Sequence, residues 1–444
     1  MQPPHGTEDG EVLFATIAAG GGHVATANAM AEAVATASGG ALRTSVSDIM
    51  AEHGPRDLDR RHKDSWRRLL GMPRVVRASQ ALMDRAPAVT RLTQDLMLSG
   101  FARDTAARLN AAPPALVVAN HGWLATAFTL ARRRHGLRTR VVIYATEPFD
   151  ASALWSTPAA EAVLAPSAAA KESLVAVGVP HDRVLVAGYP VADRFLSAPE
   201  RSLARASLGI DDAFTCLVTL GAEGVADDAV VDTLVTLAVA GVNVVCVTGR
   251  NTALRERITS RVADAGPRLR VFGFVEDMER LLAAADVVVG KAGPASTMEA
   301  LAVGRPVLAT AYAGLNELAV TDFLAAHSLG GYVGGWERLP DVVARWRDSP
   351  ALMAAAAQSA RRLDFTAMKR GIGDYLAACA DPAAFAAGTS EAGALAAGSV
   401  TAGSVSAGTD PRGAAGLLRP GALAEVTRAD LLRARTAGAR KARA

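Results

Sequence analysis

A glycine turn that ends in a histidine lies near the start of the chain, between an apolar run and an alanine-rich run. The apolar run is residues 12–17, the turn is Gly20 to His23, and the alanine-rich run continues to about residue 38. Glycines let the backbone approach a ligand closely, and the exposed amides at a helix N-terminus favour negative charge. An imidazole at the mouth of such a turn can act as a general base. The alternative is a histidine that only bonds to backbone at the start of a helix.

A second group of small and polar residues lies where a predicted strand, residues 287–290, meets the next helix. Its members are Lys291, Gly293, Ser296 and Thr297. Small residues at a helix N-terminus suit a diphosphate, and the nearby carboxylate of Glu299 suits the two hydroxyls of a ribose. Alternatively, Ser296 caps the helix and Glu299 only favours its dipole. The residues alone leave both interpretations open.

Other chemistries are disfavoured by spacing. The glycine turn lacks the G-x-G-x-x-G pattern, and the next acidic candidate, Asp48, comes late for a ribose contact. Asp57 and Asp59 spell D-x-D, but they lie in a basic stretch and not at the end of a strand. The three cysteines are widely spaced and lack the paired spacing of metal ligands. We expect no nicotinamide cofactor and no metal site.

The elements that position these residues form two series of strand-like runs separated by helical patterns. The first series is at about residues 12–17, 42–46, 116–119, 140–145, 162–164 and 184–187, and the second at 215–220, 242–248, 269–272, 287–290 and 306–309. This alternation predicts α/β domains with parallel sheets covered by helices. We therefore predict two Rossmann-like, doubly wound domains.

The predicted organisation has four parts. Residues 1–10 form a disordered N-terminus, 11–190 a first Rossmann-like domain, 191–380 a second Rossmann-like domain, and 381–444 a low-complexity linker with a basic tail. Residues 381–420 are almost wholly small and lack enough large apolar groups to offset the entropy of ordering. A flexible linker and a solvated tail are expected there, although the last segment could form a short basic helix.

Composition limits the partners and the compartment. The 47 basic and 44 acidic residues give a net charge of +3, which is too close to balance to predict nucleic-acid binding. The first ten residues lack the basic and apolar regions of a signal peptide, and residues 229–247, the longest apolar stretch, are interrupted by polar residues. We expect a cytoplasmic chain without a transmembrane helix.

Four motifs together resemble those of the two-domain GT-B glycosyltransferases. They are Gly20 to His23, Gly188 to Val191, Thr248 to Asn251, and Lys291 to Pro294 followed by Glu299 to Leu301. The resemblance is to the branch that holds monogalactosyldiacylglycerol synthase, processive diacylglycerol glucosyltransferases and the peptidoglycan N-acetylglucosaminyl transferase. It spans about residues 11–335 and implies that the two domains face each other across a cleft. It also implies that residues 11–190 form an acceptor-binding domain and residues 191–380 a nucleotide-sugar-binding domain.

The resemblance also implies roles for individual residues. His23 would activate the acceptor hydroxyl, Glu299 would hold the donor ribose, and backbone near Phe274 and Val275 would bind uracil. The donor-binding residues implied in this way are Gly22, Gly221, Arg250, Phe274, Val275, Lys291, Gly293, Ser296, Thr297, Glu299, Asn316 and Glu317.

Two departures from the family pattern concern the sugar and the acceptor. The family commonly has an Asp and then a His ahead of a Trp. Here Glu147 and Ser152 precede Trp155, so Glu147 is the candidate catalytic acid and the His is missing. Asn316 and Glu317 stand where a Gln-Glu pair is usual.

A basic block at residues 56–91 is interleaved with apolar residues and is a candidate membrane surface. The residues expected to face lipid are Trp66, Arg67, Arg68, Leu69 and Leu70. The alternative is a solvated helix face with buried leucines.

The function expected from the resemblance is hexosyl transfer from a UDP-sugar to an acceptor hydroxyl, without metal and with inversion. The acceptor would be a lipid such as diacylglycerol at the inner face of the plasma membrane. Two other enzymatic functions are a transferase for a soluble acceptor and a nucleotide-sugar epimerase. A third alternative is a catalytically silent GT-B protein that binds a nucleotide or a lipid.

Overall fold

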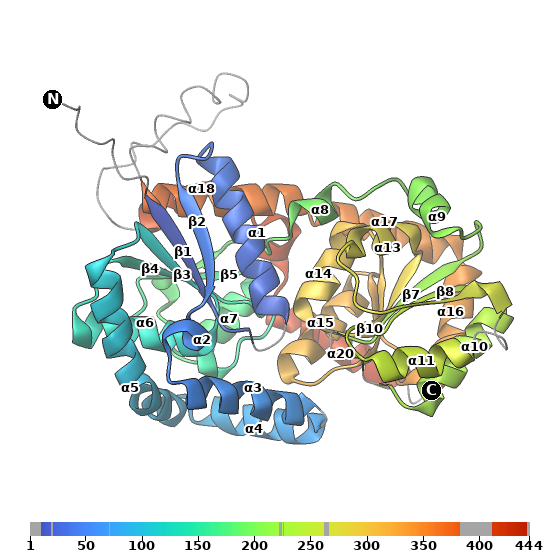
Figure 1. The fold of residues 1–444 in the computed structure, drawn as a ribbon, viewed down its shortest axis with the longest axis horizontal. Coiled ribbons are helices and arrows are strands. Elements are labelled where there is room, and N and C mark those ends of the chain that lie inside the picture. Colours follow the sequence, from blue (N-terminus) through green and yellow to red (C-terminus); the bar gives the residue numbers. More distant parts are fainter. Residues whose placement is uncertain are drawn as a thin grey trace.

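Two six-stranded parallel sheets form the framework of the protein (Figure 1). The computed structural model describes residues 10–18, 21–70, 72–221, 224, 226–261, 266–381 and 411–441. The strand order is β2-β1-β3-β4-β5-β6 in the first sheet and β12-β11-β10-β7-β8-β9 in the second. The prediction of two doubly wound α/β units is confirmed.

The strands have the following bounds. In the first sheet they are β1 (Glu11–Thr16), β2 (Arg43–Asp48), β3 (Leu116–Ala119), β4 (Arg140–Tyr144), β5 (Ala162–Ala165) and β6 (Val184–Val186). In the second they are β7 (Thr215–Thr219), β8 (Asn243–Val247), β9 (Leu269–Phe272), β10 (Val287–Lys291), β11 (Val307–Ala311) and β12 (Gly330–Tyr332). Most are short, apolar and buried on both faces, as expected for a parallel sheet covered by helices.

The helices of the first half are α1 (Gly21–Ala37), α2 (Ile49–His53), α3 (Arg56–Leu70), α4 (Pro73–Arg85), α5 (Pro87–Ala111), α6 (Gly122–His135) and α7 (Ala168–Ala176). The connecting segment holds α8 (Asp193–Leu196) and α9 (Arg201–Leu208). The later helices are α10 (Asp228–Val239), α11 (Thr252–Ser260), α13 (Met278–Ala284), α14 (Pro294–Ala302), α15 (Leu315–Ala326), α16 (Leu339–Arg347), α17 (Pro350–Arg362), α18 (Phe365–Ala380) and α20 (Arg428–Lys441).

Local capping sets the limits of several helices. Ser167 and Asp227 accept hydrogen bonds from backbone amides at the starts of α7 and α10. Gly136 and Gly209 end α6 and α9 with φ of 66° and 63°, a left-handed conformation that favours glycine. The polar and glycine residues between the apolar runs therefore terminate the helices that cover the sheets.

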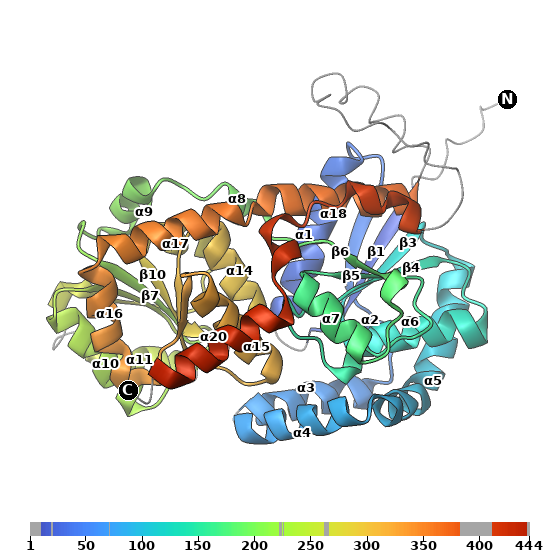
Figure 2. The ribbon, with the colours of Figure 1, turned by 180° about the vertical axis from the view of Figure 1, so that it is seen from behind.

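Helix α18 returns from the second half of the chain to the first. Its Ile372 and Tyr375 are buried in one core with Phe14 of β1 and Met30 of α1. At Gly373 the helix comes so close to α1 that a Cβ atom would collide with the backbone of α1. A helix that precedes the low-complexity segment is therefore part of the core beneath the first sheet (Figure 2).

A buried lysine joins the two halves where the chain crosses between them. Lys369 Nζ on α18 lies 2.6 Å from Glu32 Oε2 on α1 and 2.7 Å from Asp193 Oδ1 on α8. The Asp193 amide also donates to Glu32 Oε2. Since burying a lone ammonium is unfavourable, the two carboxylates hold α18, α1 and α8 together.

The last described segment differs from the expected solvated tail. Leu423, Val426 and Leu431 are buried, and Arg435 donates two hydrogen bonds to Asp322 of α15. Helix α20 packs along α15, and its beginning lies near α7 (Figure 2). The expectation is corrected for residues 411–441, because three apolar side chains and an Arg–carboxylate pair offset the entropy of ordering. Residues 382–410, most of the predicted linker, lie outside the described residues.

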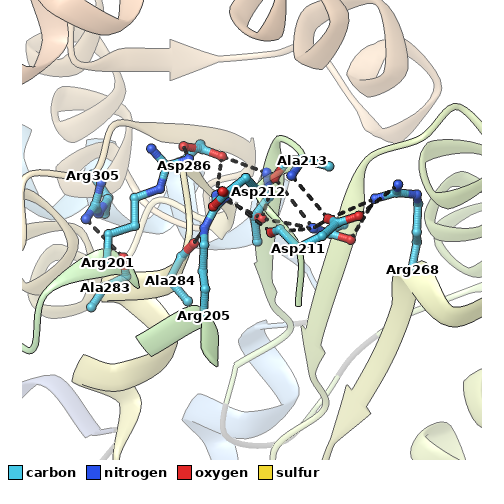
Figure 3. A network of polar contacts seen from close by, with 12 residues as sticks. Arg201, Arg205, Asp211, Asp212, Ala213, Arg268, Ala283, Ala284, Asp286 and Arg305 are labelled. Carbon is cyan, nitrogen blue, oxygen red and sulfur yellow. Dashed lines mark hydrogen bonds and ion pairs between the residues drawn. The ribbon is translucent and has the colours of Figure 1, made fainter. Parts of the chain in front are cut away.

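A buried ion-pair network attaches α9 to the second sheet (Figure 3). The Arg205 guanidinium is almost fully buried and lies 2.8 Å from Asp286 Oδ2, just before β10. Arg201 lies 2.6 Å from Asp286 Oδ1, and the Thr215 amide donates to Asp286 Oδ2 at 2.7 Å. Helix α9 of the connecting segment is thus fixed to the amino ends of β7 and β10.

Replacing Arg205 with Met should leave Asp286 buried with only part of its charge compensated. We expect the free energy of unfolding to fall by about 3–5 kcal/mol, as measured by urea denaturation. Arg268, whose pairing with Asp211 is more exposed, is the matched control, and Arg268→Met should reduce stability by about 0–1 kcal/mol. Equal losses in the two variants would show that burial does not set the strength of the Arg205 pairing.

Candidate active site

The N-termini of two helices meet between the two sheets. Helix α1 follows β1 in the first half and α14 follows β10 in the second, so both begin at the carboxyl ends of their sheets. A Cβ atom on Gly22 would lie 3.6 Å from the Cβ of Ala295 in the first turn of α14. Two positive helix ends therefore face the same space, where a bound anion would be stabilised. Gly20 lies outside the described residues.

His23 lies in the first turn of α1 and bonds to residues far away in the sequence. Its Nδ1 lies 2.8 Å from the carbonyl oxygen of Asn120 and 3.1 Å from Oγ1 of Thr146. A carbonyl only accepts, so Nδ1 carries the proton and Nε2 has the free lone pair. Burial lowers the pKa of His23 to about 4, against the opposing effect of the Asn120 hydrogen bond. His23 is therefore neutral at pH 7, with a nitrogen that can accept a proton.

The sequence analysis missed the residues that surround His23. The Asn120 side chain donates to the His23 carbonyl oxygen at 2.6 Å, and the His121 ring centre lies 4.8 Å from that of His23. His62 of α3 packs against Trp123 with ring centres 3.9 Å apart and the ring planes tilted by 39°. One signal was available, because Asn120 and His121 directly follow β3, and Thr146 lies two residues after β4. The carboxyl ends of parallel strands lie at one edge of the sheet.

Glu147 follows Thr146 and faces the other half of the molecule. Its Oε2 accepts a hydrogen bond from Thr146 Oγ1 at 3.4 Å, and burial raises its pKa to about 7. It lines a small pocket that both halves of the chain form. The other residues lining this pocket are Gln80, Asp84, Asp150, Ser152, Leu315 and Asn316. The structure thus brings the predicted Glu147 and Asn316 together.

Glu299 lies on α14 and faces a different cavity. Burial raises its pKa to about 7, although the positive charge of Arg194 opposes this shift. With Asn28, Glu32 and Arg194 it lines a groove of about 620 Å³ between α1, the connecting segment and α14. The structure therefore places Glu299 and Asn316 in separate cavities.

The structural alternatives for the start of α14 do not hold. Ser296 Oγ donates to the Gly293 carbonyl oxygen at 3.2 Å and caps no backbone amide. Glu299 lies beyond the first turn of the helix. Thr297 Oγ1 is buried without a hydrogen-bond partner. These observations leave the ligand-binding interpretation of this helix start in place.

Lys291 and Glu317 bond to each other. Lys291 Nζ lies 2.6 Å from Glu317 Oε1, and Glu317 Oε2 accepts from the Ala313 amide at 2.6 Å. Both carboxylate oxygens of Glu317 are therefore engaged inside the second half. The pair holds the end of β10 against the loop that precedes α15.

Arg250 and Phe274 lie together at the carboxyl ends of β8 and β9. The Arg250 guanidinium lies 4.5 Å from the centre of the Phe274 ring, which is 54% exposed. Val275 packs partly against the core. Gly221, just after β7, has a φ of 78°, which favours glycine. Three strand ends thus present predicted donor-binding residues on the same side of the second sheet.

Helix α4 reaches across from the first half to the second. Gln80 Oε1 accepts a hydrogen bond from the Leu315 amide at 2.8 Å, at the start of α15. The Arg77 guanidinium lies 5.2 Å from the centre of the Tyr312 ring. The basic block therefore contributes to the cleft between the halves.

The five residues predicted to face a membrane lie on α3. Arg68 is exposed and Leu69 is partly buried. The side chains of Trp66, Arg67 and Leu70 lie outside the described residues. Across the described ranges, no helix has the length and apolar character needed to span a membrane, and no three His, Cys, Asp or Glu residues are grouped as metal ligands.

Residues 215–314, from β7 to the turn before α15, match the family model described as "Glycosyltransferase family 28 C-terminal domain". This part of the chain is thus similar to the C-terminal domains of glycosyltransferase family 28. It contains Gly221, Arg250, Phe274, Val275 and the helix start with Glu299. His23 and Glu147 lie outside it, in the first half of the chain.

Curated relatives support the predicted branch. The chain is 23% identical over 361 residues to monogalactosyldiacylglycerol synthase 1 of Arabidopsis thaliana, covering 76% of this chain and 64% of that protein. It is 31% identical over 141 residues to the processive diacylglycerol beta-glucosyltransferase of Bacillus subtilis, covering 31% of this chain and 36% of that protein. The chain thus spans less than two thirds of the length of these relatives and is distantly homologous to them.

A solved structure supports the fold. A protein described as a UDP-N-acetylglucosamine 2-epimerase from Listeria monocytogenes superposes with a TM-score of 0.57 at 14% identity. The match covers 84% of this chain and 96% of that structure. At this identity the likeness shows the fold alone, and it agrees with the predicted GT-B arrangement.

The raised pKa of Glu299 predicts that this carboxylate destabilises the native protein in alkaline solution. Between its unfolded pKa of about 4.5 and its folded pKa of about 7, the native state binds more protons, so stability falls as the pH rises. Glu299→Gln should therefore raise the free energy of unfolding by about 1–2 kcal/mol at pH 8 and by much less at pH 4.5. Urea denaturation at the two pH values measures the difference.

Glu317→Gln is the control for this comparison. Because Glu317 bonds to Lys291 and to a backbone amide, its replacement should destabilise the protein at pH 8. A loss of stability in Glu299→Gln at pH 8 would contradict the interpretation of Glu299 as an uncompensated, ligand-facing carboxylate.

Proposed function

We propose that this protein is a glycosyltransferase that moves a hexosyl group from a UDP-sugar to an acceptor hydroxyl without a metal ion. The observation that carries the proposal is the placement of a neutral His23, with its Nε2 lone pair free, beside the start of α14 in the family 28 domain. A base from one half thus lies beside an anion-binding helix end of the other. The named activities of the relatives agree with this chemistry.

In the proposed reaction, His23 Nε2 takes the proton of the acceptor hydroxyl. The acceptor oxygen then bonds to the anomeric carbon of the donor sugar, while the bond from that carbon to the diphosphate oxygen breaks. The N-termini of α1 and α14 and the Arg250 guanidinium stabilise the charge that develops on the diphosphate. A single displacement of this kind inverts the anomeric configuration.

Donor recognition is assigned to the carboxyl edge of the second sheet. Phe274 offers an exposed ring for stacking of the uracil base, with Arg250 at its face. Glu299 accepts hydrogen bonds from the ribose hydroxyls, and the groove that it lines is large enough for a nucleoside. Asn316, in the pocket with Glu147, is proposed to contact the sugar.

The acceptor is proposed to be a lipid such as diacylglycerol, reached at the inner face of an anionic membrane. Seven of the twelve exposed large apolar side chains in the described part of the chain lie between residues 72 and 97. They are Met72, Val75, Leu82, Val89, Leu92, Leu96 and Met97. Exposed arginines accompany them at positions 68, 74 and 85. Apolar side chains beside cationic ones suit the interface of an anionic bilayer.

UDP binding and turnover should respond differently to two substitutions. Glu299→Gln should weaken UDP binding about 10-fold or more, because the ribose hydroxyls lose a charged acceptor. His23→Ala should leave UDP binding nearly unchanged and lower turnover by about 10²–10⁴-fold. Isothermal titration with UDP and a transfer assay with UDP-glucose and UDP-galactose on diacylglycerol vesicles measure both effects. No UDP binding by the folded wild-type protein would overturn the proposal.

Membrane binding should depend on the apolar side chains of α5. Leu92 and Leu96, four residues apart, share one helix face and are both exposed. The double substitution of Leu92 and Leu96 with Asp should reduce co-sedimentation with phosphatidylglycerol vesicles about 10-fold or more, because it removes apolar contacts and adds negative charge. Leu203 on α9, 66% exposed, is the matched control, and Leu203→Asp should bind as the wild type does. Equal losses of vesicle binding in the two variants would show that membrane binding does not depend on this face of α5.

A further inference from the structure

Thr146 lies between the two residues assigned to catalysis. It follows β4, is 5% exposed, and has its Oγ1 3.1 Å from His23 Nδ1 and 3.4 Å from Glu147 Oε2. Because the Asn120 carbonyl also contacts Nδ1, that nitrogen carries the proton of the neutral ring. The Thr146 hydroxyl therefore accepts from His23 and donates its own hydrogen to Glu147.

We propose that Thr146 is a positioning residue that couples the negative charge of Glu147 to His23, so that the three side chains act as one unit. The inference rests on the proposed function, in which His23 is the base. It assigns Glu147 a role through Thr146 and not by contact with substrate. A hydroxyl that donates to a carboxylate directs its oxygen lone pairs toward the imidazole and favours the ring when it becomes positive.

The proton balance of this arrangement is simple. His23 begins with a proton on Nδ1 and takes the acceptor proton on Nε2, so the ring becomes an imidazolium. The Nδ1 proton stays on His23, shared between the Asn120 carbonyl and the Thr146 hydroxyl, and no proton moves to Glu147. Glu147 contributes by its charge and by fixing the direction of the Thr146 hydroxyl.

The coupling requires an ionised Glu147. Burial raises the pKa of Glu147 to about 7. Below that pH the carboxyl is protonated and no longer supplies the negative charge that favours a positive ring on His23. The titratable groups near Glu147 are Asp84 and Asp150, which line the same pocket, and Tyr144 and Tyr189, while the Trp155 side chain donates a hydrogen bond to Glu147. Burial raises the pKa of both tyrosines, so they stay neutral. We therefore expect kcat/KM to fall as the pH drops below about 7, and we assign this acid limb of the pH profile to the protonation of Glu147.

Two other kinds of titratable group could affect the pH profile and must be distinguished from Glu147. His121 and His62 lie beside His23, and burial lowers the pKa of each. Glu299 has a pKa of about 7 but lies on α14, in the other cavity. Substitution at Thr146 and at Glu147 distinguishes these groups, because only these two changes should remove the limb.

The kinetic test compares Thr146→Val, Thr146→Ser and Glu147→Gln over pH 5–9. Thr146→Val keeps the shape of the side chain and removes the hydroxyl, so we expect kcat to fall about 10–100-fold with the donor KM nearly unchanged. Thr146→Ser should stay within about 3-fold of the wild type. In Thr146→Val and Glu147→Gln the acid limb near pH 7 should disappear. A valine variant with the wild-type limb, or a serine variant as slow as valine, would overturn the proposal.

A second test needs no turnover. Histidine ¹⁵N NMR of the full chain should show His23 with its proton on Nδ1, and its signals should shift near pH 7 as Glu147 ionises. This shift should be absent in Thr146→Val and Glu147→Gln. A shift that persists in Thr146→Val would overturn the coupling even if the transferase assay succeeds. Conversely, a protein with the coupling but without UDP binding would contradict the proposed function and leave the coupling standing.

Discussion

The site depends on one geometric constraint, which is that all strands of each sheet are parallel and that the carboxyl ends of the two sheets face each other. Helices α1 and α14 both begin at these ends, so their positive termini point into one space. Without an anion between them, two like dipole ends repel, and the contact at Gly22 and Ala295 must be held by packing elsewhere. Lys369, with its two carboxylates, and α20, with its Asp322 pairing, hold the halves at this distance.

Burial shifts the pKa values of the site residues in opposite directions. It keeps His23 neutral to about pH 4, while it keeps Glu147 and Glu299 partly protonated to about pH 7. The buried His23 therefore lowers the stability of the native state in acid, and the two buried carboxylates lower it in alkaline solution. His23 is neutral while Glu147 and Glu299 are both ionised only near and above pH 7. The hydrogen bonds that His23 Nδ1 donates to the Asn120 carbonyl and the Thr146 hydroxyl give the neutral imidazole a single orientation.

Much of the fold and part of the site could be predicted from the sequence. The strand runs, the glycine turn before His23 and the small residues before Glu299 are local patterns, and local patterns determine where strands and helices begin. Asn120 and Thr146 were missed because their relation to His23 comes from the strand order β1-β3-β4, which places segments about 100 residues apart side by side. The separation of Glu299 from Asn316 follows from the contact of α1 with α14, and no local pattern encodes it. The tail was misjudged because Leu423, Val426 and Leu431 are only three large apolar residues, yet each finds a buried site in the existing domains.

The return of α18 to the first half has a consequence for how the chain acquires its structure during synthesis. Ile372 and Tyr375 complete a core whose other members, such as Phe14 and Met30, leave the ribosome far earlier. At about 5–20 residues per second, the interval between residues 190 and 380 is roughly 10–40 s. During that time the α1 side of the first sheet has no cover from α18, so a nascent chain exposes an apolar surface until its second half has been made. The core of the first half can therefore be completed only after the ribosome has synthesised the second half and α18.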